Sequence, residues 1–169
     1  TGHSLVLRHL FLLLSRRPRL RRWMEESPHA AALSSRFVAG TRIEDALRAS
    51  ERLNQAGLMT TLDYLGESVT TLEEAAAARG VYLRLLEEIH RRKLAANISV
   101  KLTQLGIDVS DAACRENVAA IARRAAEQGN FVGIDMESSA YTDRTLALVH
   151  DLHAGGALIG AVIQRYLYR

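Results

Sequence analysis

The chain has 169 residues, of which 48% are hydrophobic and 24% charged, with a formal net charge of +3 at pH 7. This composition suits a soluble globular polypeptide with one core and excludes a disordered chain. Nucleic-acid binders interleave basic residues with aromatic ones, whereas aromatics make up only 5% of this chain, so no nucleic-acid partner is expected.

Cysteine usage points to a reducing compartment. Cys114 is the only cysteine, which excludes an intrachain disulfide and a multi-cysteine zinc site, and no metal is expected. The apolar stretch 10–14 is far shorter than the ~20 residues that cross a bilayer, and the arginines follow it instead of preceding it. Because the chain starts at Thr1 without an initiator Met, we interpret it as a fragment, so a missing targeting signal means little.

Strand-like and helix-like runs alternate after an N-terminal region, 1–35, that has a helical pattern and a solvated arginine-rich face. Five strands are predicted, at 36–40, 58–67, 97–106, 131–138 and 157–169. Helices are predicted between them, with N-terminal caps at Thr41, Thr71, Ser110 and Thr142. Glu44 and Glu74 complete the spacing of a capping box with the first two of these caps.

Five strands separated by four helices predict a parallel sheet with right-handed crossovers. Open doubly wound sheets and (β/α) barrels both satisfy this pattern. A GxGxxG motif does not follow the first strand, and GxxxxGK[ST] does not occur, so the nucleotide-binding open sheets lack their usual signal.

Polar residues recur near the carboxyl-terminal parts of four predicted strands: Asp63, Lys101, Asp135 and Gln164. In the run ISVKLT, Lys101 has the opposite parity to the aliphatic residues and so faces away from their packing. Inward-facing polar groups at the carboxyl ends of barrel strands build active sites, so the recurrence favours a barrel with a site at this end.

Lys101 and Asp135 belong to sequential strands, which are neighbours in a barrel, so an ion pair between them is predicted. A buried lysine without such a partner tends to lose its proton. The residues alone leave open whether this pair is catalytic or only locks the strand register.

The runs RFVAG, TLDYLGE, ISVKLTQLGID, VGIDMESSAYTDRTL and VIQRYLYR carry a resemblance that covers 36–169. In their order and spacing they resemble the proline dehydrogenase family of flavin-dependent enzymes. The resemblance implies an α/β fold, a parallel (β/α)8 TIM-type barrel truncated after the fifth strand and preceded by N-terminal helices. The implied domains are an N-terminal helical region, 1–35, and a partial barrel, 36–169.

By the same resemblance, the activity is oxidation of L-proline to Δ1-pyrroline-5-carboxylate by hydride transfer to FAD, whose electrons pass to a quinone. Lys101 then meets the carboxylate of proline, and Asp135 is the active-site aspartate beside substrate and flavin. Met136 and Gln164 correspond to positions that contact the FAD. The cytoplasmic location expected from the single cysteine is retained, and a peripheral contact at the inner membrane stays open.

This chain differs from the family pattern in being shorter. The family barrel has three further strands, and its later part supplies arginines that reach the flavin and the proline carboxylate. The fragment alone is therefore expected to be inactive. Two alternatives stay open: an aldolase-type barrel in which Lys101 forms a Schiff base, and an inactive partial barrel that acts only by association.

Overall fold

The structure, a computed structural model, describes residues 38–163. The chain divides into two compact units, Thr1–Asp45 and Ala46–Arg169, and the description below concerns the second except where stated. The helical region expected over 1–35 lies outside the described residues, so that region and its boundary stay predictions.

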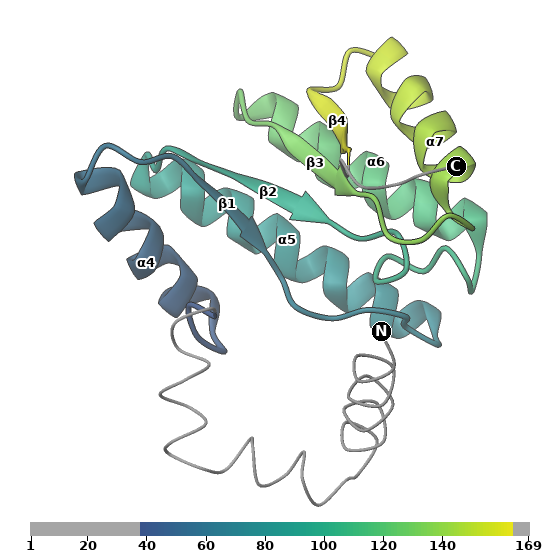
Figure 1. The fold of residues 1–169 in the computed structure, drawn as a ribbon, viewed down its shortest axis with the longest axis horizontal. Coiled ribbons are helices and arrows are strands. Elements are labelled where there is room, and N and C mark those ends of the chain that lie inside the picture. The colour runs from purple at the N-terminus through teal and green to yellow at the C-terminus, as the bar shows by residue number, and fades with distance from the viewer. Residues whose placement is uncertain (1–37, 164–169) are drawn as a thin grey trace, which may run out of the picture. The chain divides into compact units, whose positions relative to one another are not determined.

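Four parallel strands form one sheet in the order β1-β2-β3-β4 (Figure 1). The strands are β1 (Thr60–Asp63), β2 (Ala96–Val100), β3 (Val132–Asp135) and β4 (Ile159–Val162). Helix α4 (Ile43–Gln55) precedes β1, and the connections between consecutive strands are α5 (Leu72–Arg92), α6 (Asp111–Glu127) and α7 (Thr142–Ala154). The alternation of parallel strands and helices predicted from the sequence is confirmed over this part of the chain.

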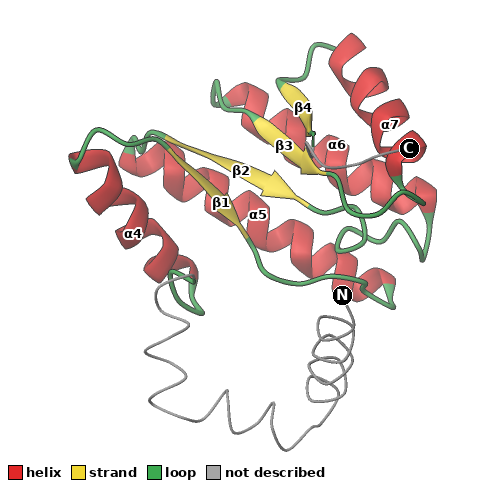
Figure 2. Cartoon of the chain, in the orientation of Figure 1, coloured by secondary structure: helices red, strands yellow, loops and turns green. Residues whose placement is uncertain are grey.

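One face of the sheet packs against helices, α5 against β2, α6 against β3 and α7 against β4 (Figure 2). Strand register lines up Leu62, Ile98, Val132 and Ile159 on this face. Ile98 and Val132 are fully buried, and Ile98 is flanked along β2 by buried Val100. The opposite face carries the other parity, which places Ser99, Lys101 and Asp135 away from the helix-packed core. We call this opposite face the inner face.

Two of the four predicted helix caps are confirmed. Thr71 and Glu74 form the capping box of α5, and the Ser110 side chain accepts a hydrogen bond from the Ala113 amide at the start of α6. Thr142 does not cap α7, because it is already the first residue of the helix. The cap position is held by Tyr141, which makes no side-chain cap bond.

The cap predicted at Thr41, in the first unit, is also wrong. Helix α4 begins at Ile43, and the Asp45 carboxylate, not the predicted Glu44, accepts the hydrogen bond from the Arg42 amide. Asp45 takes this role because it stands three residues after Arg42, the spacing from which a side chain reaches back to the amide at the helix start.

Each of the four described strands is shorter than the strand predicted from the sequence. The run predicted as 97–106 leaves the sheet after Val100, and residues 102–109 form turns in which the Ile107 amide donates to the Leu102 carbonyl. Leu102, Leu105 and Ile107 are buried under these turns, so the apolar residues that prolonged the strand pattern pack in a turn instead.

The strand predicted at 36–40 is wrong over its described residues. Val38, Ala39 and Gly40 are outside any strand, and 36–37 lie beyond the described part. Gly40 has φ +152°, and a Cβ there would clash with the Asp45 side chain, so the chain turns here into α4 instead of extending. The last predicted strand, 157–169, is observed as β4, and Gln164 lies outside the described residues.

No helix within 38–163 combines the length and the apolar character that crossing a membrane requires.

Candidate active site

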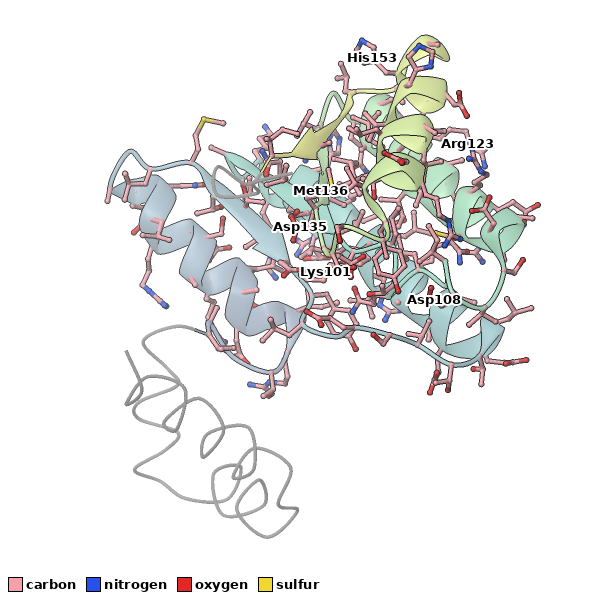
Figure 3. The ribbon with its side chains drawn as sticks, turned by 45° about the vertical axis from the view of Figure 1, so that its right-hand side comes forward. Lys101, Asp108, Arg123, Asp135, Met136 and His153 are labelled. Atoms are coloured by element: carbon pink, nitrogen blue, oxygen red, sulfur yellow. The ribbon has the colours of Figure 1, made fainter. Side chains whose placement is uncertain are left out.

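The polar strand ends meet at the carboxyl end of the inner face. Asp63 is the last residue of β1, Lys101 follows β2 directly, and Asp135 is the last residue of β3. Figure 3 shows Lys101, Asp135 and Met136 gathered near these strand ends, whereas Arg123 and His153 lie on outer helices. The parallel order of the strands brings together residues that are far apart in the sequence.

The Lys101 ammonium lies between two carboxylates. Its Nζ is 2.6 Å from Asp63 Oδ2 and 3.3 Å from Asp135 Oδ2. The lysine side chain is only 15% exposed, while the two carboxylates are about twice as exposed, at 30% and 28%. The predicted ion pair of Lys101 with Asp135 is therefore present. The distance from the ammonium to Asp63 is shorter than the distance to Asp135.

The pKa of Lys101 is raised above its ordinary value. Burial, the largest single influence, acts to lower it, but the hydrogen bonds and negative charges of Asp63 and Asp135 together outweigh burial. The lysine is therefore held as a cation, and its ammonium has three N–H groups to donate.

Asp63 is in turn held from the helical layer. The Tyr82 hydroxyl of α5 lies 3.4 Å from Asp63 Oδ1 and donates to Gln104 Oε1 at 2.9 Å. Burial and the nearby Asp63 charge raise the pKa of Tyr82. The Gln104 amide donates to the Tyr64 carbonyl, which ties the loop after β1 to the turn after β2.

The residues after β3 are fixed by contacts with the same turn. Glu137 accepts hydrogen bonds from the Thr103 amide and the Thr103 hydroxyl. The Tyr141 hydroxyl donates to Asp108 Oδ2 at 2.7 Å, which raises the pKa of Tyr141. These contacts hold the segment that follows Met136 against the turn after β2.

A cavity of about 610 Å³ opens at this rim. Its charged lining residues are Glu67, Lys101, Asp135 and Glu137, three carboxylates and one ammonium. Met136, Val162 and Tyr141 add apolar and aromatic surface. A zwitterion with separated carboxylate and ammonium groups matches this arrangement, because Lys101 attracts the first group and the carboxylates attract the second.

The cavity brings together three of the four residues to which the resemblance gives a role. Lys101, Asp135 and Met136 line it, and Gln164 lies outside the described residues. Sequence reasoning missed Ser99, whose hydroxyl donates to Asp135 Oδ1, and Glu137. The parity of Ser99, two residues before Lys101 on β2, was the signal that could have found it.

The described fold and site define a class, an α/β protein with a charged site at the carboxyl ends of parallel strands. More particularly, the chain belongs to the proline dehydrogenase family, because the model of the family described as "Proline dehydrogenase" matches residues 46–169.

Relatives in two organisms give the extent of the match. "Proline dehydrogenase 1" of Bacillus subtilis (strain 168) is 34% identical over 165 residues, which is 97% of this chain and 54% of that protein. "Proline dehydrogenase" of Deinococcus radiodurans is 32% identical over 142 residues, 81% of this chain and 46% of that protein. The chain thus spans about half the length of the curated relatives it matches.

Two solved structures share the fold. Proline utilization A from Bdellovibrio bacteriovorus, inactivated by N-propargylglycine, superposes with a TM-score of 0.74 at 23% identity over 82% of this chain and 17% of that one. Proline utilization A of Bradyrhizobium japonicum gives a TM-score of 0.62 at 22% identity, over 81% of this chain and 16% of that one.

Proposed function

We propose that this chain contributes the first part of the catalytic domain of a proline dehydrogenase, a (β/α)8 barrel that oxidises L-proline to Δ1-pyrroline-5-carboxylate. The observation that carries the proposal is the position of Lys101 between Asp63 and Asp135 at the carboxyl ends of parallel strands, in a member of this family. Parallel strands with helices on one face and a polar inner face are typical of such a barrel.

The substrate fits the charges of the site. Lys101 donates to the proline carboxylate with an N–H group that points into the cavity, while Asp63 and Asp135 fix its ammonium. Asp135 and Glu137, which line the same cavity, offer carboxylates to the cationic nitrogen of proline. The two ends of the zwitterion are thereby held in one orientation, with the ring carbon beside the nitrogen directed into the cavity.

FAD is the cofactor that we propose for this site. The chemistry of the lining residues fits the ring end of the flavin, since Met136 and Val162 offer apolar contact surface beside the charged cluster. We assign Met136 and Gln164 as contacts of the flavin, the latter through an amide that both donates and accepts. The flavin, when bound, accepts the hydride from proline, and the chain's own residues orient the substrate toward it.

The aldolase-type alternative needs an uncharged Lys101 as the nucleophile. The raised pKa of Lys101, in which the carboxylates of Asp63 and Asp135 overcome the opposing effect of burial, favours the charged form. This charge supports the role in binding a carboxylate over a role in forming a Schiff base.

A quinone is the proposed electron acceptor, with the protein in the cytoplasm and in peripheral contact with the inner membrane where the quinone resides. Reoxidation of the reduced protein by a soluble quinone analogue, followed by flavin absorbance, tests this step separately from proline oxidation.

The proposal is tested by mixing the FAD-loaded full-length protein with L-proline in the absence of oxygen. We expect loss of the oxidised-flavin absorbance and formation of Δ1-pyrroline-5-carboxylate, trapped with o-aminobenzaldehyde. D-proline, which has the same functional groups in the mirror-image arrangement, is the matched control and should react far more slowly. A flavin that stays oxidised with L-proline contradicts the proposal.

A further inference from the structure

Ser99 lies on the inner face of β2, two residues before Lys101, and is 5% exposed. Its hydroxyl donates a hydrogen bond to Oδ1 of Asp135, on the neighbouring strand. The other oxygen of the same carboxylate, Oδ2, is 3.3 Å from Lys101 Nζ. The two oxygens of Asp135 therefore have different partners, a neutral hydroxyl and a cation.

Gly133 is the neighbour of Ser99 on the inner face. Ser99 and Gly133 are paired in the register of β2 and β3, and Asp135 stands two residues further along β3 on the same face. A Cβ built at Gly133 would lie 3.4 Å from Ser99 Oγ and 3.4 Å from Val162 Cγ2. A longer side chain at this position would fill the gap between these two neighbours, next to the path from Ser99 to Asp135.

We propose that Ser99 is a positioning residue that acts through Asp135. By holding Oδ1, it stops rotation of the carboxylate about its last side-chain bond and keeps Oδ2 directed toward Lys101 and the cavity. Lys101 alone does not fix this rotation, because either oxygen of a carboxylate can accept from an ammonium. A serine in place of a charged donor leaves the net charge of the cluster unchanged.

The direct test follows the Asp135 carboxyl carbon by NMR in the full-length protein labelled with ¹³C-aspartate, with the signal assigned from its absence in Asp135→Asn. In Ser99→Ala we expect the signal to move, because the carboxylate loses a donor. In Ser99→Thr, which keeps a hydroxyl on a residue suited to a strand, we expect it near the wild-type position.

Thr103→Val is the matched control. Thr103 lies in the turn after β2, and the substitution removes its hydroxyl from the Glu137 carboxylate with little change in volume. Glu137 keeps its hydrogen bond from the backbone amide of residue 103. The Asp135 signal should stay in place in this variant. An Asp135 signal that is unmoved in Ser99→Ala, or that moves equally in Thr103→Val, overturns the inference.

The consequence for turnover rests on the proposed function. With proline as substrate, Ser99→Ala should lower kcat/KM about tenfold or more at unchanged FAD content, and Ser99→Thr should recover most of it. Unchanged kcat/KM in a Ser99→Ala variant whose signal has moved overturns the positioning role. If the wild-type protein does not oxidise proline, the proposed function fails, and the Asp135 signal alone decides the inference.

Discussion

Lys101 has three N–H groups, and the carboxylates of Asp63 and Asp135 accept from two of them. The cluster therefore combines a fixed cation with a remaining donor that a ligand in the cavity can use. This arrangement differs from a simple ion pair, because the ammonium has two carboxylate partners instead of one. The second carboxylate holds the ammonium in place when a ligand carboxylate approaches.

Replacing Lys101 by alanine should weaken the binding of proline and of anionic proline analogues to the full-length protein. Loss of one charge-assisted contact costs about 1.5–3 kcal/mol, or roughly ten- to a hundredfold in affinity. The Kd of a carboxylate inhibitor, measured from its effect on flavin absorbance, checks this.

Arg123→Ala is the control for this variant, because it removes one positive charge from an exposed position on α6. It should leave the inhibitor Kd unchanged. An unaltered Kd in Lys101→Ala would return the lysine to a structural role.

At the scale of the elements, the parity of the strand residues and the caps of α5 and α6 were predictable from the sequence, whereas the caps of α4 and α7 and the strand ends were not. The alternation in ISVKLT placed Lys101 on the face opposite Ile98 and Val100, as observed. The pattern continued past Val100 because Leu102 is also apolar, yet the chain turns there and buries Leu102 in the turn. Burial alone does not distinguish a strand residue from a turn residue.

The contacts within the site were also only partly predictable from the sequence. The pairing of Lys101 with Asp135 follows from the order of the strands, which the alternation of elements predicts. The contacts of Ser99 with Asp135 and of Tyr82 with Asp63 depend on strand register and on the rotation of α5. The face of Ser99 was predictable from its parity, but its partner was not, because the pairing of residues between strands also depends on packing across the sheet.

The caps of α5 and α7 provide a test at this scale. Thr71→Ala removes the acceptor of the Glu74 amide hydrogen bond and should lower the free energy of unfolding by about 1 kcal/mol. Thr142→Ala is the matched control, since Thr142 does not cap α7. Thermal unfolding of the full-length variants checks both, and an equal loss of stability in the two would contradict the observed cap positions.

On the scale of the whole molecule, β1 and β4 are the outer strands of the described sheet, and each has one side without a strand partner among residues 38–163. Ile163, just after β4, is 72% exposed, and Met59, just before β1, is 78% exposed. Unpaired parallel edges next to exposed apolar side chains promote association between chains. A closed barrel removes such edges.

We therefore expect the 169-residue polypeptide, expressed by itself, to self-associate and to purify without stoichiometric FAD. Size-exclusion chromatography with light scattering and the flavin absorbance of the purified polypeptide measure both properties. A monomer that unfolds cooperatively and carries bound flavin would contradict this expectation.

The central claim is that the cluster of Lys101, Asp63 and Asp135 is the catalytic site, and the most direct measurement is the kcat/KM for proline of the full-length Asp135→Ala variant. Asp135 faces the cavity and not the helix-packed core, so the variant should fold. Asp143→Ala, on the first turn of α7 and outside the cavity lining, is the control and should keep wild-type activity. We predict that Asp135→Ala lowers kcat/KM by orders of magnitude while it stays folded and binds FAD, whereas a kcat/KM close to that of the wild type would contradict the account.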